Sequence, residues 1–579
     1  MKKLLIPILL LSGVIGINTS CNKTLTEVPL ASYSPENSYT NKTQFESALA
    51  QIYLQIRTHM YAQTDAASNY DMLGPDVDLG NTNNAVTFTS SLFSWQLINA
   101  DDGFSSKWFS RFYAWIANAN TIINRADQPA AKWASDADKN AIVGEAKFLR
   151  AFSYHFLANM WGGVPLVLNE TTGPKFDYVR TTQDSIWLQC EKDLQFAVQY
   201  LPTIDKLKGG RAPREAAYHL LAEVEICRKN YQAAIDAATA VINNGKSSLM
   251  TTRFGVNKSF KFSGYSYQGA AVPWGDVYWD LFQDGNFNYS EGNKETIWNI
   301  EQDGKLIGGD NTDVNASGGF FGMERWWTSA PWVLTDKNGF VSYLMDTLMG
   351  RGTGTIAPSD YAATQIWNYK GDFNNDMRNS QYNIQRVYYW TNPNSSLFGQ
   401  VMRSQDCNAA SQPNFAFRAA PTFKKFANTV HNLPNVYPVF QDGTSKNWHN
   451  NGRTYKDWYI MRLAETYLLR AEAYMDKGDN ASAANDINVI RSRATATPVT
   501  PADVNIDVIL DERARELYGE EFRINTLMRL GKFVEYLNKY NGYLLANGLK
   551  APDKLKLLPI PNSQIQANTG AVLTQNAGY

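Results

Sequence analysis

The sequence lacks an excess of either charge. Its 579 residues include 54 lysines and arginines against 55 aspartates and glutamates, so the formal net charge is −1. Proteins that hold nucleic acid by its phosphate backbone need an excess of basic side chains. We therefore expect no nucleic acid partner.

The chain also has little of what metal sites require. It contains four cysteines and five histidines, with no CxxC pair and no His-rich spacing. Cys190 and Cys227 fall in predicted helices, where cysteine is commonly a small buried hydrophobic residue. Asp372 and Asp376 lie in GDFNNDMRN and could hold a divalent cation, but turn formation explains this stretch as well. We expect no metal and no cofactor.

Long apolar runs are missing too. Residues 4–17 are apolar but too short to span a bilayer comfortably, and they follow two lysines as in a secretory signal peptide. The run ends before Cys21 in a pattern that resembles a bacterial lipoprotein signal. We predict that residues 1–20 are removed and that acylated Cys21 anchors the protein to a membrane surface. The usual leucine is replaced by Asn18, so an ordinary signal peptide is the alternative.

Aromatic side chains are abundant, with 16 tryptophans and 31 tyrosines beside many asparagines and glycines. Most of these rings are expected to fill the core. Some could instead form stacking surfaces for flat ligands that are rich in hydroxyl groups.

The stretch GEAKFLRAFSYHFLANMWGGVPLV, residues 144–167, predicts a helix that is apolar on opposite sides and therefore buried. Gly162, Gly163 and Pro165 should end it. Its Glu145 and Arg150 are expected to make structural pairs. The same periodicity predicts further helices over residues 41–57, 108–125, 136–160, 182–201, 214–228, 231–243 and 506–530.

Two helical hairpins align without a gap, LLAEVEICRKNYQAAIDAATAVIN and LLRAEAYMDKGDNASAANDINVIRSRA. In this alignment Ala222-Glu223 falls on Ala471-Glu472, and the turn Lys229-Asn230 falls on Gly478-Asp479. This is the pattern of tetratricopeptide-like helix pairs, which need stacked neighbours to bury their faces. The charged residues of 506–530 are predicted to pair between helices rather than to act as catalytic carboxylates.

Between the two hairpins, helical periodicity fades and Gly, Asn, Ser and aromatic residues dominate. Short strands are expected near 295–300 and 385–390. We predict a mainly α fold in which residues 21–244 and 456–579 form a tetratricopeptide-like helix-pair stack. Residues 245–455 would form a loop-rich insertion that packs on this stack.

Several motifs occur together in a characteristic order, and on them the chain resembles the SusD/RagB family of outer-membrane nutrient-binding lipoproteins. The resemblance runs from Cys21 to Tyr579. Its strongest parts are EAKFLRAFSYHFLANMWGGVPLV, RLAETYLLRAEAY, ILDERARELYGEEFR, LMRLGKF, LLPIP and QNAGY, in which Ala577 replaces the usual proline. The resemblance implies the fold predicted above and no catalysis. It also implies a surface-exposed position at the outer membrane, where members cap a TonB-dependent (SusC-like) transporter like a lid and capture oligosaccharides or, in some cases, peptides.

In that family, ligands bind on the face formed by an early loop and the irregular insertion. Sugar rings stack on Trp and Tyr, and their hydroxyls need Asn, Asp, Gln and Arg partners. The alternatives are loop anchoring for the tryptophans and turn formation for the aspartates, whereas Trp279 is expected in the core. The predicted contact residues are Trp326, Trp327, Trp274, Arg325, Asp76, Asp78 and Asn83.

Two other functions are open at this stage. The chain could bind peptides within the same kind of uptake system. Less favoured is a secreted glycosidase, which needs two carboxylates roughly 5–10 Å apart around the sugar. Asp276, Asp280 and Glu324 are the nearest candidates, although no spacing singles them out.

Overall fold

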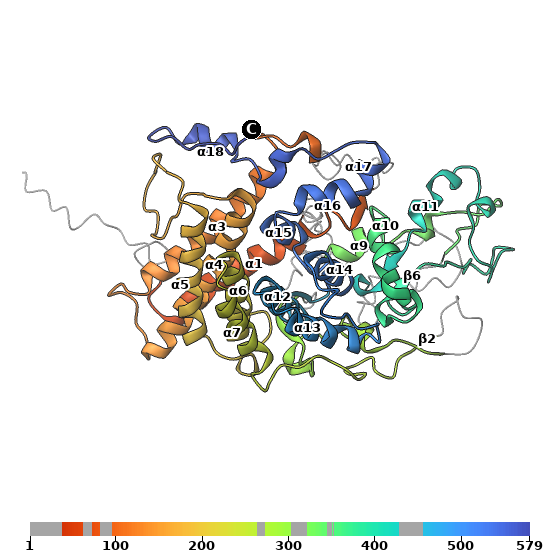
Figure 1. Cartoon of the computed structure of the whole chain (residues 1–579), viewed down its shortest axis with the longest axis horizontal. Coiled ribbons are helices and arrows are strands. Elements are labelled where there is room, and N and C mark those ends of the chain that lie inside the picture. The colour runs from red at the N-terminus through yellow and green to blue at the C-terminus, as the bar shows by residue number, and fades with distance from the viewer. Residues whose placement is uncertain are drawn as a thin grey trace, which may run out of the picture.

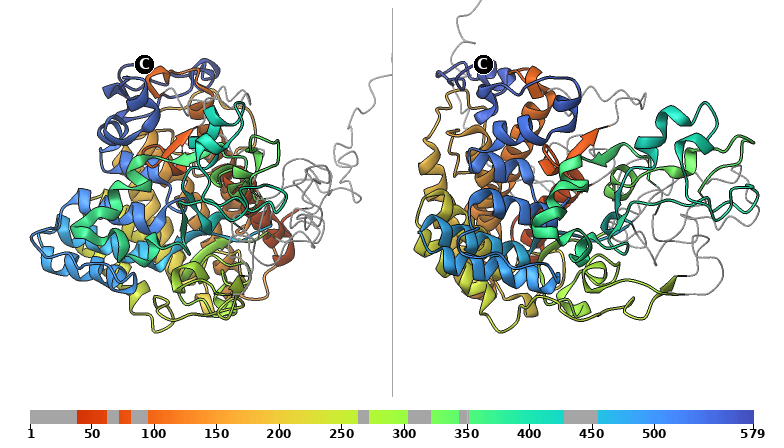
Figure 2. Two further views of the ribbon diagram at one scale, coloured as in Figure 1. Left: turned by 90° about the vertical axis from the view of Figure 1, so that its right-hand side faces the viewer. Right: turned by 45° about the vertical axis from the view of Figure 1, so that its right-hand side comes forward.

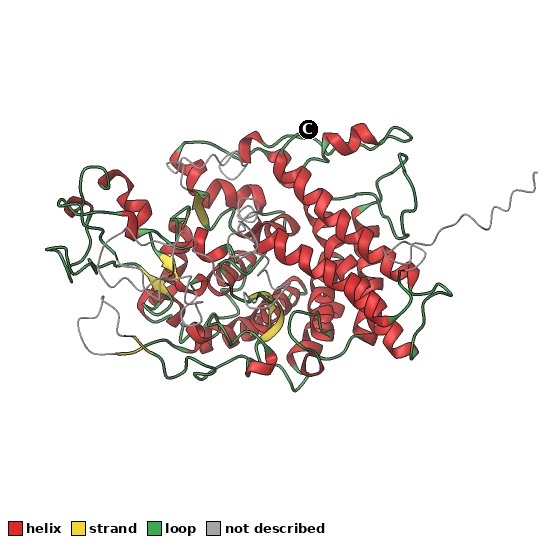
Figure 3. Ribbon diagram, turned by 180° about the vertical axis from the view of Figure 1, so that it is seen from behind, coloured by secondary structure: helices red, strands yellow, loops and turns green. Residues whose placement is uncertain are grey.

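The structure is a computed structural model that describes residues 38–61, 72–80, 95–262, 272–302, 321–343, 350, 352–427 and 455–579. Figure 1 shows an elongated molecule with the helices of the first half at one end, those of the C-terminal part in the middle and the elements of residues 350–427 at the other end. The prediction of a mainly helical stack with a loop-rich insertion is confirmed (Figure 3).

The N-terminal helices start where polar caps stand. Asp102, Ser135 and Thr182 each accept hydrogen bonds from the first backbone amides of the helix that follows. These helices are α1 (Lys42–Tyr61), α3 (Gly103–Arg125), α4 (Asp136–Trp161), α5 (Gln183–Tyr200), α6 (Arg214–Cys227) and α7 (Tyr231–Ile242). They agree with the predicted segments to within a few residues.

The C-terminal part continues the stack. Its helices are α12 (Leu463–Asp476), α13 (Asn480–Arg493), α14 (Ile506–Leu517), α15 (Arg523–Arg529), α16 (Phe533–Tyr540), α17 (Gly542–Ala546) and α18 (Asn562–Ala567). Helix α12 packs against both α7 and α13. Ile226 and Ile235 of the first hairpin meet Leu469 and Ala473 of the second in one buried cluster. The two hairpins that align in sequence are therefore neighbours in space.

The single helix predicted over 506–530 is wrong, because the chain breaks between α14 and α15. Gly519 adopts φ +70°, and an added Cβ there would lie 2.4 Å from the ring of Phe426. The indole nitrogen of Trp458 also donates to the Gly519 carbonyl, at 3.0 Å. A glycine backbone in the left-handed region, approached closely by aromatic rings, ends the helix.

Helix α4 is the buried centre of the N-terminal half. Apart from Lys147, every residue from Ile142 to its end is buried. Arg150 binds Asp193 of α5 with both Nε and Nη2, at 2.8 and 2.7 Å. Glu145 accepts from Tyr53 and Arg211, so the predicted structural pairs are confirmed.

Helix α4 stops at the predicted Gly-Gly step, and the second glycine touches another segment. An added Cβ at Gly163 would lie 2.5 Å from the carbonyl oxygen of Thr181. We expect Gly163→Ala to lower the free energy of unfolding by about 1–3 kcal/mol, because backbone must move to admit the methyl group. Denaturant unfolding measures this. Gly173→Ala, where nothing lies within 4 Å, is the matched control and should change little; equal effects would refute the steric account.

The strands of the described chain are short and all pair antiparallel. The predicted strand at 295–300 is confirmed as β4 (Thr296–Ile300), which pairs with β8 (Trp458–Arg462). The predicted strand at 385–390 shrinks to β6 (Ile384–Gln385), which pairs with β7 (Thr422–Phe423). The other pairs are β1 (Asp78–Gly80) with β5 (Ile356–Pro358) and β2 (Lys261–Phe262) with β3 (Val272–Pro273).

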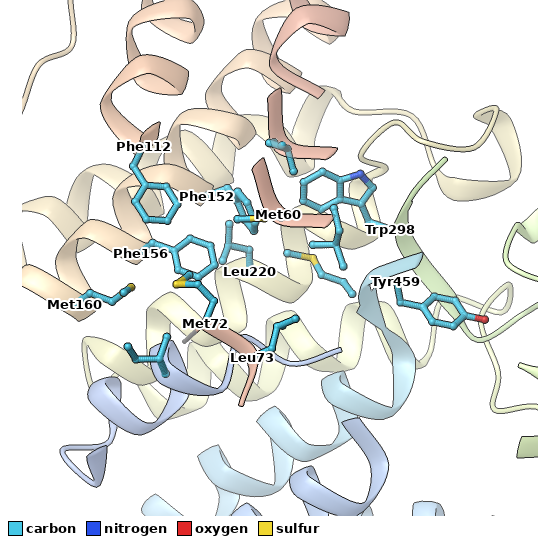
Figure 4. Close-up of a cluster of buried hydrophobic side chains, with 14 of the residues drawn as sticks. Met60, Met72, Leu73, Phe112, Phe152, Phe156, Met160, Leu220, Trp298 and Tyr459 are labelled. Atoms are coloured by element: carbon cyan, nitrogen blue, oxygen red, sulfur yellow. The ribbon is translucent and has the colours of Figure 1, made fainter. Parts of the chain in front are cut away.

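Strand β4 ties the insertion to the helices. Figure 4 shows Trp298 and Tyr459, one from each strand of the β4–β8 pair, bordering a core filled by Met60, Phe152 and Phe156. The helices described in the insertion are short. They include α8 (Val277–Asp280), α9 (Met323–Trp327), α10 (Asp360–Ala363), α11 (Phe415–Arg418) and the 3-10 helices η7 (Gln365–Asn374) and η8 (Met377–Asn379). Its exact limits, 245 and 455, stay a prediction.

Buried ion pairs fasten the insertion to α13 and α14. The charge pattern of residues 506–530 predicted structural ion pairs but not these partners. Arg378 of η8 binds both Glu512 and Glu516 of α14, at 2.8 and 3.0 Å. Arg491 of α13 joins Glu512 to Asp372 of η7, at 2.7 and 2.6 Å. In the described part of the chain, no helix is long and apolar enough to cross a membrane.

Candidate functional site in the insertion

Two of the predicted contact tryptophans are buried. Trp274 and Trp327 are each 2% exposed. Trp274 packs edge-on against Tyr382, with ring centroids 5.1 Å apart, and the Lys424 ammonium lies 4.5 Å from its centroid. Trp327 lies against Phe426. Protein covers both indoles in this conformation, which favours anchoring, and Trp279 is buried as expected.

Arg325 and Trp326 lie beside Trp327 on the five-residue helix α9, and both are half-buried. Trp326 packs against the main hydrophobic core with part of its surface open. The backbone carbonyl of Arg325 accepts hydrogen bonds from Thr353. Both therefore keep some side-chain surface accessible to a ligand.

The predicted acidic and amide contact residues do not lie on helix α9 with Arg325 and Trp326. Asp76 is fully buried, and Arg523 of α15 donates three hydrogen bonds to its carboxylate at 2.9–3.2 Å. Asp78 lies in β1, where it pairs with Pro358. Asn83 and the predicted lipidation residue, Cys21, lie outside the described residues.

The carboxylates considered for catalysis or cation binding have structural partners. Asp276 caps α8 and accepts from Asn383 at 2.9 Å, and Asp280 binds Arg253. Glu324 is buried. The cation candidates bind separate arginines, Asp372 with Arg491 and Asp376 with Arg378. Within the described ranges no group of His, Cys, Asp or Glu is arranged to hold a metal ion.

An open groove of about 660 Å³ lies elsewhere in the insertion, between η7, η8 and β6. Its volume is in the range of small-molecule sites. None of the predicted contact residues that the structure describes lines it. Its lining residues are Phe373, Asn374, Asp376, Asn379, Ser380, Gln381, Ile384, Gln385, Arg386, Val387, Tyr389 and Gly399.

The groove combines apolar and polar surface. Phe373 and Tyr389 are half-buried, Val387 is 48% exposed, and the amides of Asn374 and Gln381 are exposed. Such a surface offers ring faces and edges for the C–H patches of a sugar, with amides for its hydroxyls. The sequence signal is the stretch FNNDMRNSQYNIQRVYY, where aromatic and amide residues alternate without helical or strand periodicity.

Arg386 is held in place at the side of this groove. Its Nη2 donates to the Ala363 carbonyl at 2.8 Å and to the Asn379 side chain, and its Nη1 donates to the Asn379 carbonyl at 3.3 Å. The guanidinium carbon lies 5.4 Å from the centroid of Phe373. Burial lowers the pKa of Arg386 to about 10, which leaves it protonated at neutral pH.

Comparison with known proteins gives two family matches in separate parts of the chain. Residues 294–579 match the model of the SusD family, and residues 31–226 match a model described as "Starch-binding associating with outer membrane". The chain belongs to the SusD/RagB family. The family description associates its members with the outer membrane, in agreement with the resemblance seen in the sequence.

Relatives of this SusD-family chain include SusD-like protein P25 of Formosa agariphila, 24% identical over 95% of this chain and 94% of that protein. Starch-binding protein SusD of Bacteroides thetaiotaomicron is 37% identical over 153 residues, which are 24% of this chain and 27% of that protein. Among solved structures, a laminarin-binding SusD-like protein superposes with a TM-score of 0.61 at 21% identity, over 93% of this chain and all of that one. That likeness establishes the shared fold.

Proposed function

We propose that this protein captures oligosaccharides at the outer membrane and does not transform them. The observation that carries the proposal is the groove of the insertion, where Phe373 and Tyr389 stand beside exposed amides and a positioned arginine. Family membership supports the proposal, because relatives are named for binding starch and laminarin.

The groove suits binding better than hydrolysis. Glycoside hydrolysis needs two carboxylates on either side of the scissile bond. Among the described residues that line the groove, the one carboxylate is Asp376, which is buried and bound to Arg378 at 2.6 Å. Sugar hydroxyls are already hydrated in water, so each contact gains little and affinity should be modest.

We further propose that acylated Cys21 anchors the protein and that it delivers its ligand to a TonB-dependent outer-membrane transporter, which it caps like a lid. The predicted processing of residues 1–20 and the outer-membrane description of the family support this. Arg325 and Trp326 remain proposed as additional ligand contacts, because both side chains are partly accessible.

We expect Tyr389→Ala to weaken binding of the best oligosaccharide by about tenfold, because a ring that stacks on a ligand contributes about 0.5–1.5 kcal/mol beyond its buried area. The ligand is first chosen by screening the mature protein against a broad glycan panel and a peptide panel. Calorimetric titration then compares the dissociation constants of wild type and variant.

The matched control is Tyr231→Ala, a half-buried tyrosine of α7, a helix that lies in the other half of the molecule from β6 (Figure 1). It should leave affinity unchanged. If Tyr389→Ala keeps full affinity and Trp326→Ala loses it, the ligand binds at α9 and not in the groove. If the protein binds peptides but no glycan, its ligands are peptides. If new reducing ends appear when the protein is incubated with oligosaccharides, it is an enzyme and the binding-only function is wrong.

A further inference from the structure

Arg386 has no acidic partner among the described residues, whereas the nearby Arg378 is paired with Asp376. Its hydrogen-bond partners are two backbone carbonyl oxygens and the side-chain oxygen of Asn379, and burial lowers its pKa. A carboxylate nearby would raise that pKa instead. The groove therefore holds a positive charge that no described carboxylate compensates.

The one negative charge in the lining does not offset it. Asp376 is bound to Arg378 and belongs to a buried network with equal numbers of basic and acidic side chains. The network is therefore neutral as a unit. Its members are Arg378, Arg462, Arg491, Arg493, Arg515 and Lys425, with Asp372, Asp376, Glu295, Glu512, Glu516 and Glu520.

Arg386 also has donors to spare. A guanidinium carries five N–H groups in a planar fork. Three hydrogen bonds to Ala363 and Asn379 are present, so the Nε–H and one Nη1–H have no partner among the described residues. They lie on different edges of the guanidinium, so each can donate one hydrogen bond to an oxyanion that the positive charge attracts.

We propose that this groove selects an acidic saccharide, whose carboxylate or sulfate group pairs with Arg386. The inference rests on the proposed glycan-binding function and names its ligand class. Phe373 and Asn379 hold the guanidinium before the ligand arrives, so little side-chain entropy is lost on binding. The oxyanion supplies the negative charge that the groove lacks, while Tyr389 and the amides contact the sugar ring.

The test is calorimetric titration of the mature protein with matched oligosaccharides. Trigalacturonate is compared with its methyl ester, and a sulfated disaccharide with its unsulfated form; neutral malto- and laminari-oligosaccharides complete the series. We expect one acidic member to bind at least about tenfold more tightly than its uncharged match, with weaker binding at high salt. The pair that shows the difference distinguishes carboxylate from sulfate.

Arg386→Gln should remove this tenfold preference, because it weakens binding of the acidic member far more than binding of its uncharged match. Arg386→Lys should keep part of the preference, because it retains the charge without the fork. Lys370→Gln is the control for general electrostatics, since this exposed cation of η7 pairs with Asp503. Melting temperatures report whether each variant is folded.

The outcomes separate this inference from the proposed function. Equal affinity for acidic and uncharged matches in the wild type overturns the inference and leaves glycan capture standing, even if the glutamine variant does not fold. Equal weakening of both matches by Arg386→Gln also overturns it, because the arginine would then only shape the groove. Binding of no glycan in either panel overturns both.

Discussion

Glu516→Ala is expected to lower the free energy of unfolding by about 3–5 kcal/mol, because it leaves buried charges without a partner. Glu516 of α14 is fully buried. Its carboxylate accepts from Arg462 at 2.6 Å, from Arg378 at 3.0 Å and from Arg493. One side chain thus joins β8, the insertion and α13.

The charge state of Glu516 supports this expectation. Burial alone would raise the pKa of its carboxyl group, but Arg493, Arg462 and Arg378 outweigh burial and hold that pKa well below its usual range. Glu516 is therefore ionised in the folded protein, and a neutral replacement loses the interaction with all three arginines.

Equilibrium unfolding in urea measures the loss as a lower midpoint. The matched control is Glu535→Ala on α16, whose partner Lys532 is 2.9 Å away at the surface, with the glutamate side chain 49% exposed. Exposed pairs of this kind contribute up to about 1 kcal/mol. If the two variants unfold at the same urea concentration, the network does not fasten the insertion to the stack.

The helices could be predicted because their signals are local. Apolar periodicity and the polar caps Asp102, Ser135 and Thr182 lie within each segment. The break at Gly519 could not be predicted, because Phe426 and Trp458, distant in sequence, approach that backbone. The sequence predicted that the charged residues of 506–530 form ion pairs. It could not predict their partners, because partners such as Asp76 for Arg523 come from distant parts of the chain.

The candidate site was predictable in composition but not in place. Stacking rings and amides in the insertion were expected, and the groove contains them. Whether a ligand can reach a given aromatic ring, however, depends on the residues from other segments that pack against it. Tyr382 and Lys424 cover Trp274, and Phe426 covers Trp327, whereas Tyr389 keeps an accessible surface. Sequence patterns do not reveal which aromatic faces such packing leaves free.

A second large loss of stability is expected from a substitution at the β4–β8 strand pair, where the insertion joins the helical stack. Trp298 of β4 is 1% exposed and touches both N-terminal helices that border it. Its ring lies 5.2 Å from those of Phe148 and Phe152 on α4 and 6.1 Å from that of Tyr53 on α1, and its indole N–H donates to the Gly210 carbonyl. Trp298→Ala should lower the free energy of unfolding by about 3–5 kcal/mol, because the cavity cannot close against several rigid helices.

Urea unfolding again provides the measurement, and two variants make it specific. Trp298→Phe keeps most of the apolar volume and should cost much less than the alanine variant, since it loses only part of the ring and one hydrogen bond. Leu97→Ala, at a side chain that is 66% exposed, should cost almost nothing. A cost for Trp298→Ala no larger than that of Leu97→Ala would mean that this strand does not join the insertion to the helical stack. A large cost recovered mostly by phenylalanine would show that filled volume at this junction, rather than the indole hydrogen bond, holds the binding region on its scaffold.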